Sequence, residues 1–452
     1  MLSLRIVRGM KMEPNELHLE AQDLNQQGAM LLRTGNLDAA KAKFDKAIEL
    51  DPMLMDSYKN YGDLYMSLQE YQNAKNSYKK AMLIEKSGLL HFLYGNACFM
   101  NDELHEGLES YNLAINEGYD GDEMMFFMGM AYEHMHDDNM AMRYFQKACV
   151  KNPSRPDYLV KKIGALVRLG MYDSANESAN ELLAKAPEMF DGYHIKTQLL
   201  LHEEKYDEAT TFAKAASDKF PEDADLLYDY AKALSLAKKL DEAIKVIDSA
   251  KAMKYFEDAK RQFVLLEGQI YAECNNYEKA IACCKACIAL EAESGFDGEA
   301  RFMLMNLYLA GPNYQKAFDQ AVEIVKQDTE DLYYYAALYY RPFCTKQLGN
   351  TDEARKFYKE ANSIYRLATL KNPAAIDIYL YRAMCLKDME EYDKSLEMLD
   401  FITGLSNQIA EVHTIRADIY RIQGRKSLAE EELQKAYRIK PELNPNTESV
   451  GE

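Results

Sequence analysis

Two groups of residues in this sequence have the side chains that bind metals. Cys283, Cys284 and Cys287 contain a C-x-x-C pattern, and residues 133–138 read Glu-His-Met-His-Asp-Asp. A closed zinc site needs four ligands, yet the sequence places no second cysteine pair at suitable spacing and no histidine beside the cysteines. We therefore predict no metal and no cofactor. Cys284 and Cys287 are interpreted as packing positions, because buried cysteine behaves as a small hydrophobe.

Motifs that would indicate catalysis are also missing. His105-Glu106 lacks the second histidine of a zinc protease. The sequence contains no G-x-G-x-x-G after a strand pattern, no phosphate loop and no G-x-S-x-G. We predict that the protein is not an enzyme, and that its helices position binding surfaces instead of a catalytic centre.

Small and aromatic residues recur with a period of 34. Glycines recur first, alanine or glycine follows twelve residues later, an aromatic residue four after that, and alanine three further on. These four series are Gly28, Gly62, Gly95 and Gly129; Ala40, Ala74, Gly107 and Ala141; Phe44, Tyr78, Tyr111 and Phe145; and Ala47, Ala81, Ala114 and Ala148. A period between 20 and 50 residues indicates a stacked array with no single large core.

Each repeat divides into two predicted helices. In the second repeat Tyr58, Gly62 and Tyr65 fall on one helical face, residues 68–71 form a turn, and Ala74 begins the inner face of a second helix. Small residues let two antiparallel helices approach closely, and the aromatic side chain between them fills the remaining space.

These residues resemble the tetratricopeptide repeat. Its full pattern is present in Gly129, Tyr132, Ala141, Phe145, Ala148 and Pro153. The resemblance implies an all-α fold of helix-turn-helix repeats stacked into a right-handed superhelical solenoid. About twelve repeats cover residues 16–441.

The spacing predicts four regions. We expect a disordered N-terminal extension at 1–15, a regular array of about seven repeats at 16–250, an irregular array of about five at 251–441, and a disordered tail at 442–452. In the irregular array the period stretches to 37 and 41, so helices or loops there must lengthen. Pro342 falls inside a predicted first helix, and we expect that helix to kink or break at Arg341.

The resemblance implies that first helices line an inner surface that binds extended peptides or helices. Exposed positions on this surface lie three before, one after and four after the motif glycine. The candidate partner-binding residues are Lys59, Asp63, Phe92, Asn96, Phe99, Phe126, Met130, Phe302, Asn306, Tyr339 and Phe343. Lys59 and Asn96 suit the carboxylate clamp of chaperone-binding members, but Asp63 replaces an expected asparagine and would repel a carboxylate.

Composition limits the partners. The net charge of −19 disfavours nucleic acid, whose binding depends on many Lys and Arg contacts to phosphate. The sequence contains no run of about 18 apolar residues, so we predict no membrane insertion. Eight cysteines without a secretory signal favour the cytoplasm. We predict an interaction scaffold for a protein or peptide. Alternatives are a peptide-responsive regulator and a subunit that presents substrates to a separate enzyme, and self-association through the uncapped last repeat is a further expectation.

Overall fold

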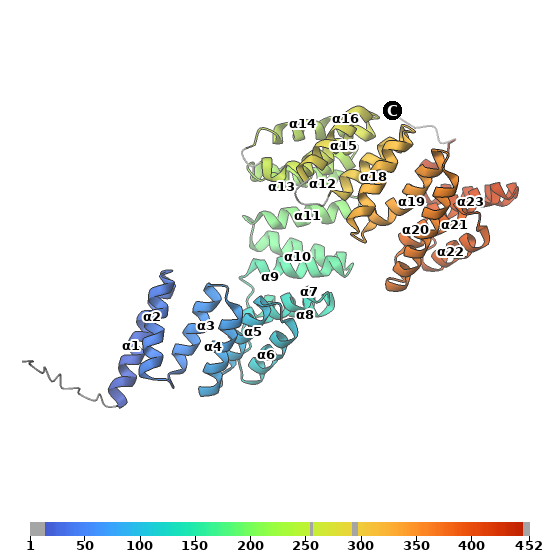
Figure 1. The fold of residues 1–452 in the computed structure, drawn as a ribbon. Helices are drawn as coiled ribbons and strands as arrows, with labels where there is room; N and C mark the ends of the chain where they lie inside the picture. Colours follow the sequence, from blue (N-terminus) through green and yellow to red (C-terminus); the bar gives the residue numbers. More distant parts are fainter. Residues whose placement is uncertain (1–13, 254–255, 292–296, 446–452) are drawn as a thin grey trace, which may run out of the picture. The chain divides into compact units, whose positions relative to one another are not determined.

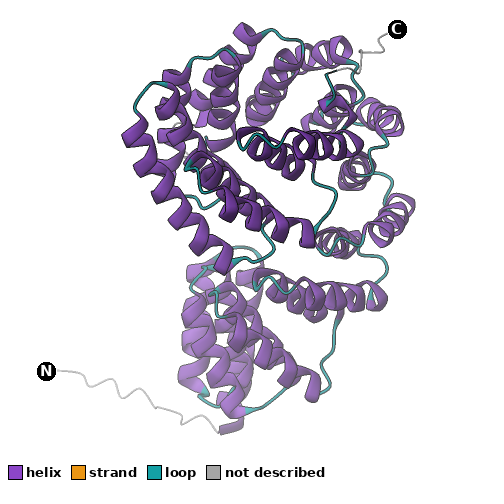
Figure 2. Cartoon of the chain, turned by 90° about the vertical axis from the view of Figure 1, so that its right-hand side faces the viewer, coloured by secondary structure: helices purple, strands orange, loops and turns teal. Residues whose placement is uncertain are grey.

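The computed structural model describes residues 14–253, 256–291 and 297–445, and its regular elements are all helical (Figures 1 and 2). The chain divides into two compact units, residues 1–220 and 221–452. Of the two ends expected to be disordered, 1–15 and 442–452, residues 1–13 and 446–452 lie outside the described residues. The expectation is wrong for 14–15, which begin α1, and for 442–443, which belong to a 3-10 turn. The boundaries proposed at 250 and 441 stay predictions.

The described part of unit 1, residues 14–220, contains six helix pairs. Its helices are α1 (Pro14–Arg33), α2 (Leu37–Leu50), α3 (Met55–Ser67), α4 (Tyr71–Ile84), α5 (Gly88–Met100), α6 (Leu104–Asn116), α7 (Asp122–His134), α8 (Asp138–Lys151), α9 (Pro156–Arg168), α10 (Tyr172–Lys185), α11 (Phe190–His202) and α12 (Tyr206–Lys219).

Unit 2 continues with six more pairs and a short final turn. Its elements are α13 (Ala224–Leu236), α14 (Leu240–Ala250), α15 (Phe256–Glu273), α16 (Tyr277–Glu291), α17 (Gly298–Ala310), α18 (Tyr314–Gln327), α19 (Leu332–Gln347), α20 (Thr351–Lys371), α21 (Ile376–Asp388), α22 (Tyr392–Leu405), α23 (Ala410–Ile422), α24 (Lys426–Ile439) and the 3-10 turn η1 (Pro441–Leu443).

Every odd-numbered helix packs against the helix that follows it, and first helices of successive repeats also touch within each unit, as α5 touches α7 and α17 touches α19. The all-α helix-turn-helix prediction is therefore confirmed. Among the described residues, no helix combines the length and the apolar character that crossing a membrane requires.

The motif glycines are small because an aromatic ring lies against them. A Cβ atom on Gly62 would come within 2.4 Å of the Tyr78 ring, and one on Gly129 within 2.6 Å of the Phe145 ring. Such distances are shorter than any real van der Waals contact, so the predicted pairing of glycine with an aromatic residue is confirmed.

The turns within the repeats repeat the same period. One residue in nearly every turn adopts a left-handed backbone, namely Gly35, Gln69, Asp102, His136, Gly170, Glu204, Lys238, Asn275, Gly349, Glu390 and Gly424. In this conformation the chain reverses and the helix carbonyls are capped by backbone N–H groups, such as that of Gly35 bonding to Leu32 O at 3.0 Å.

The stretched repeats contain longer helices, as predicted. Helix α20 has 21 residues and α15 has 18, against 13 in α3 and 14 in α4 of the second repeat. Of the kink or break predicted at Arg341, the break is wrong, since α19 runs without interruption through Pro342, and the kink stays a prediction. Pro342, Leu338 and Cys344 are all buried, and tertiary packing of this kind outweighs a local helix defect of about 3 kcal/mol.

Candidate functional site

Three successive first helices of unit 2 border an apolar cleft of about 400 Å³. Its walls come from α15 (Gln269 and Ala272), α17 (Glu299, Phe302, Met303, Asn306, Leu307 and Ala310) and α19 (Tyr333). A cleft with mainly apolar walls and a few polar groups at its edge is the usual form of a binding site for a side chain or small ligand.

The repeat register places these residues together. Phe302 and Asn306 are one turn apart on α17, and Gln269 holds on α15 the place that Asn306 holds one repeat later. A Cβ on Gly268 would lie 3.0 Å from Cys283 Cβ. The glycine therefore lets α15 lie close to α16 beside the cleft.

Aromatic rings from two repeats form part of the wall. The rings of Phe302 and Tyr333 are tilted, with centroids 5.5 Å apart. Burial and the nearby Glu299 carboxylate raise the pKa of Tyr333. Its phenol therefore stays protonated at neutral pH and can donate a hydrogen bond to a ligand.

Two carboxamides that are available for hydrogen bonding and one carboxylate lie at the rim of the cleft. Gln269 and Asn306 are exposed, and their side chains make no hydrogen bond with residues that the structure describes. A carboxamide offers both a donor and an acceptor, so each can pair with a peptide group. Glu299 lies 3.4 Å from Arg261, a pair that solvent screens.

The other two residues predicted in unit 2 lie away from the cleft. Tyr339 is 4% exposed and donates a hydrogen bond to Asp388 at 2.9 Å. Phe343 is half-buried, and its ring lies 6.1 Å from that of Tyr339. The expected exposure of Tyr339 is wrong, because α21 supplies Asp388 and Tyr381 as its neighbours.

In unit 1 the predicted polar residues are already partnered. Lys59 pairs with Asp63 at 2.8 Å, and Tyr78 donates a hydrogen bond to the same carboxylate at 2.7 Å. Asn96 accepts a hydrogen bond from Tyr111 at 2.8 Å. Asp63 thus neutralises the cation that a carboxylate clamp would need.

The predicted aromatic residues of unit 1 pack between repeats. Phe92 is 4% exposed and stacks on Tyr119 at 5.1 Å, so its expected exposure is wrong. Phe126 is half-buried and stacks on Tyr158 at 4.8 Å. Phe99 and Met130 are also half-buried, which leaves only part of each side chain for a partner. A register error of one helical residue suffices to exchange groove and interface positions.

Among the described residues, the group most similar to a set of metal ligands is Cys98, Glu103 and Glu106. The Lys75 ammonium lies 3.0 Å from Glu106 and also pairs with Glu103. Burial raises the pKa of the Cys98 thiol to about 11. A protonated thiol and carboxylates neutralised by lysine are poor cation ligands.

The cysteine and histidine groups of the sequence analysis have structural surroundings. Cys284 and Cys287 are fully buried, as predicted, and burial raises the pKa of Cys284 to about 12. Residues 133–138 span the turn between α7 and α8, where Glu133 pairs with Lys161 at 2.9 Å and with Arg168 at 2.7 Å.

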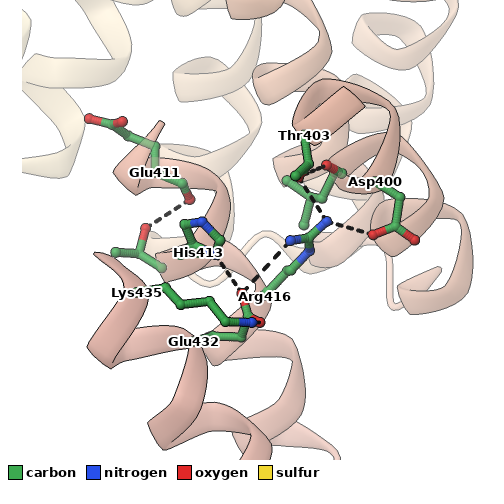
Figure 3. Close-up of polar contacts among 9 residues, drawn as sticks. Asp400, Thr403, Glu411, His413, Arg416, Glu432 and Lys435 are labelled. Carbon is green, nitrogen blue, oxygen red and sulfur yellow. Dashed lines mark hydrogen bonds and ion pairs between the residues drawn. The ribbon is translucent and has the colours of Figure 1, made fainter. Parts of the chain in front are cut away.

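The last repeat contains a buried ionic network that the sequence analysis missed (Figure 3). Glu432 on α24 bonds to His413 and Lys435, each at 2.6 Å. The Arg416 guanidinium on α23 lies 3.8 Å from the Glu432 carboxylate and 2.5 Å from the Asp400 carboxylate on α22. His413, Arg416 and Glu432 are each less than 10% exposed. No regular repeat has an acidic residue at the position of Glu432, which was the available signal.

Electrostatics determine the charge state of this network. Burial alone would raise the pKa of Glu432, but hydrogen bonds from His413 and Lys435 outweigh it and lower the pKa. The carboxylate is therefore ionised at neutral pH and ties α24 to α23, while Arg416 ties α23 to α22.

Family comparisons agree with this architecture. Models described as tetratricopeptide repeat match residues 24–52, 56–87 and 200–261, and one described as tetratricopeptide repeat protein 21 ARM repeat matches residues 259–427. The chain is a tetratricopeptide repeat protein. The matches lie in both units, in agreement with the helix pairs seen in each.

This tetratricopeptide repeat protein is similar to curated human proteins over most of its length. It is 21% identical to DnaJ homolog subfamily C member 7 of Homo sapiens, with 94% of this chain and 78% of that protein covered. Tetratricopeptide repeat protein 16 of Homo sapiens is 19% identical, with 87% and 47% covered. The chain thus spans about half the length of the second relative.

Solved structures similar to this repeat protein include yeast Tom70 and the Cut9–Hcn1 complex. The Tom70 structure is 12% identical with a TM-score of 0.49, covering 96% of this chain and 98% of that one. The Cut9–Hcn1 structure is 14% identical with a TM-score of 0.43, covering 95% and 94%.

Proposed function

We propose that this tetratricopeptide repeat protein is a non-catalytic interaction scaffold that holds a peptide or helical segment of a protein partner. The cleft bordered by α15, α17 and α19 would receive the anchoring side chain of that segment. The observation that carries the proposal is the juxtaposition of apolar walls with two uncommitted carboxamides on the faces of successive first helices.

The chemistry of the cleft favours a segment with one large apolar side chain. Phe302, Met303 and Leu307 offer apolar contact, which contributes about 25 cal/mol for each Å² removed from water. Gln269 and Asn306 can bond the backbone on either side of that anchor. A partner whose binding buries such an anchor gains both affinity and a fixed register.

The proposal also includes the cellular compartment of the scaffold and the unit that holds its main binding site. All eight cysteines are free thiols, which suits a reducing compartment such as the cytoplasm. Buried Phe92 and half-buried Phe126 belong to the inter-repeat packing of unit 1, so we place the primary anchor in unit 2.

Site-specific photo-crosslinking tests the proposal. Benzoylphenylalanine would replace exposed Asn306 at the cleft, or exposed Ala282 on the second helix α16 as the matched position. We expect a defined protein to crosslink through position 306 and not through 282. Equal crosslinking at both positions, or none at 306, contradicts the proposed site.

A further inference from the structure

A second and larger cleft lies in unit 1, between α10, α11 and α12. Its volume is about 1130 Å³, and Leu200, Phe212 and Ala215 form its apolar part. Its remaining lining is dominated by carboxylates: Asp173, Glu177, Glu203, Asp207 and Glu208. The proposed scaffold function does not use this cleft.

The two lysines of the cleft are held by its own side chains. Lys196 donates a hydrogen bond to Asn176 at 2.9 Å, and Lys205 pairs with Glu203 at 2.8 Å. Two lysines face five carboxylates in this cleft, so its lining keeps a net negative charge.

Three of those carboxylates make no hydrogen bond or ion pair with described residues, namely Asp173, Glu177 and Glu208. Asp173 and Glu177 are like charges at i and i+4 on α10, a spacing that destabilises a helix. Asp173 and Glu208 lie in first turns, where the helix dipole favours acids. Glu177 has no such compensation, and a cationic occupant would supply it.

The chain itself contains a segment of matching chemistry. Residues 1–13 read MLSLRIVRGMKME, in which Arg5, Arg8 and Lys11 recur every third residue. Leu2, Leu4, Ile6 and Val7 lie among them. This segment lies outside the described residues and adjoins α1, which begins at Pro14.

We propose that residues 1–13 of a second copy of the chain bind in this cleft. Their cations would pair with the carboxylates of Asp173, Glu177 and Glu208, and their apolar side chains would lie on Leu200 and Phe212. The pairing of opposite charges over an apolar floor gives the contact both its orientation and its selectivity.

A second copy is required because the chain's own segment is too short. Arg8 lies six residues before Pro14, so it reaches at most about 22 Å from the start of α1. Five first-helix steps separate α1 from α11. At an interaxial distance of 8–10 Å for each step, the path along the first helices to the cleft is about 40–50 Å, roughly twice that reach.

Fluorescence anisotropy with a labelled synthetic peptide of residues 1–13 tests the contact. The acceptor is the full chain with R5E/R8E/K11E, whose own segment no longer matches the cleft. We expect saturable binding that E177K/E208K weakens at least about tenfold. The control is E85K/E109K, which makes the same change of net charge at two exposed carboxylates, Glu85 just after α4 and Glu109 on α6. It should alter binding less than about twofold.

Three results would overturn the proposal: no saturable binding, equal weakening by both double variants, or undiminished binding of a peptide whose Leu2, Leu4, Ile6 and Val7 are serine. A charge-swapped peptide with R5E/R8E/K11E should instead bind an E177K/E208K acceptor that keeps the wild-type residues 1–13. Circular dichroism checks that each acceptor is folded, so that loss of binding reports on the cleft.

Sedimentation of the unmodified chain tests the source of the segment. Its average mass should rise with concentration, and either R5E/R8E/K11E or E177K/E208K should prevent the rise. A chain that remains monomeric at all concentrations overturns the assignment to a second copy.

Discussion

The rings of Phe302 and Tyr333 lie 5.5 Å apart and line the same cleft, although they belong to successive repeats. Phe302 is on α17 and Tyr333 on α19, so neither repeat could form the cleft alone. Specific binding therefore depends on how the repeats stack, and substitutions in the cleft can separate binding from folding.

Replacing Phe302 with alanine should weaken binding of an anchored peptide by at least about tenfold, since an aromatic anchor contact contributes 2 kcal/mol or more at the centre of an interface. Because Phe302 is only half-buried, the melting temperature should fall by only a few degrees. Phe318→Ala on α18 is the control, as that ring is equally half-buried but outside the cleft. Equal effects of both variants on binding would refute the role of Phe302.

Alanine at two first-helix glycines should have opposite effects on stability. Gly129→Ala would place Cβ 2.6 Å from Phe145, and overpacking of this kind destabilises by about 1–3 kcal/mol. Gly164→Ala meets only Arg168 Nη1 at 3.5 Å, so it should stabilise the helix by about 0.5–1 kcal/mol. Urea unfolding measures both. A neutral Gly129→Ala would mean that the aromatic ring does not require the glycine.

The period predicted the architecture because packing of small against aromatic residues repeats in every unit. It placed Gly62 against Tyr78 and the long α20 in a stretched repeat. It did not distinguish groove from interface for Phe92 and Tyr339, because burial there depends on Tyr119 and Asp388 of the next repeats. Phe302 and Asn306 do lie together at the cleft, but Tyr333 is not one of the predicted inner-surface positions. The Glu432 network joins three helices, and no local sequence pattern encodes the contacts between them.

Thiol reactivity should follow burial. Burial raises the pKa of Cys98 to about 11 and of Cys284 and Cys344 to about 12. These thiols should resist iodoacetamide at pH 8, while exposed Cys274 reacts. Mass spectrometry of the alkylated peptides checks the order. Modification of Cys284 as fast as Cys274 in folded protein would contradict the packing.

The buried carboxylate of the last repeat should be required to hold α24. Glu432→Ala leaves buried His413 without its partner and leaves Arg416 with Asp400 and Thr403 alone, and breaking a buried ionic pair costs about 3–5 kcal/mol. Hydrogen exchange should show faster opening of α24. The adjacent exposed Glu431→Ala is the control, and equal exchange in both variants would show that the network contributes nothing.

Acid should remove the contribution of Glu106 to the free energy of unfolding. Hydrogen bonds from Tyr94 and Lys75 lower the pKa of Glu106 to about 2. A folded-state pKa below the ordinary carboxyl value of about 4.3 stabilises the fold above that value, and the stabilisation is lost as pH falls toward 2. The stability difference between wild type and Glu106→Gln should therefore shrink between pH 5 and pH 2. Glu109→Gln, on the exposed face of α6, should show no such trend.

The central claim is that the cleft of α15, α17 and α19 receives an apolar anchor of a partner segment. Calorimetric titration of a peptide selected on the full chain from a displayed library tests it most directly. Ala310→Trp would fill the cleft, whereas Ala282→Trp places the same side chain on exposed α16. Ala310→Trp should weaken binding at least about tenfold, and Ala282→Trp should leave it unchanged. Full affinity in the Ala310→Trp variant would contradict the claim.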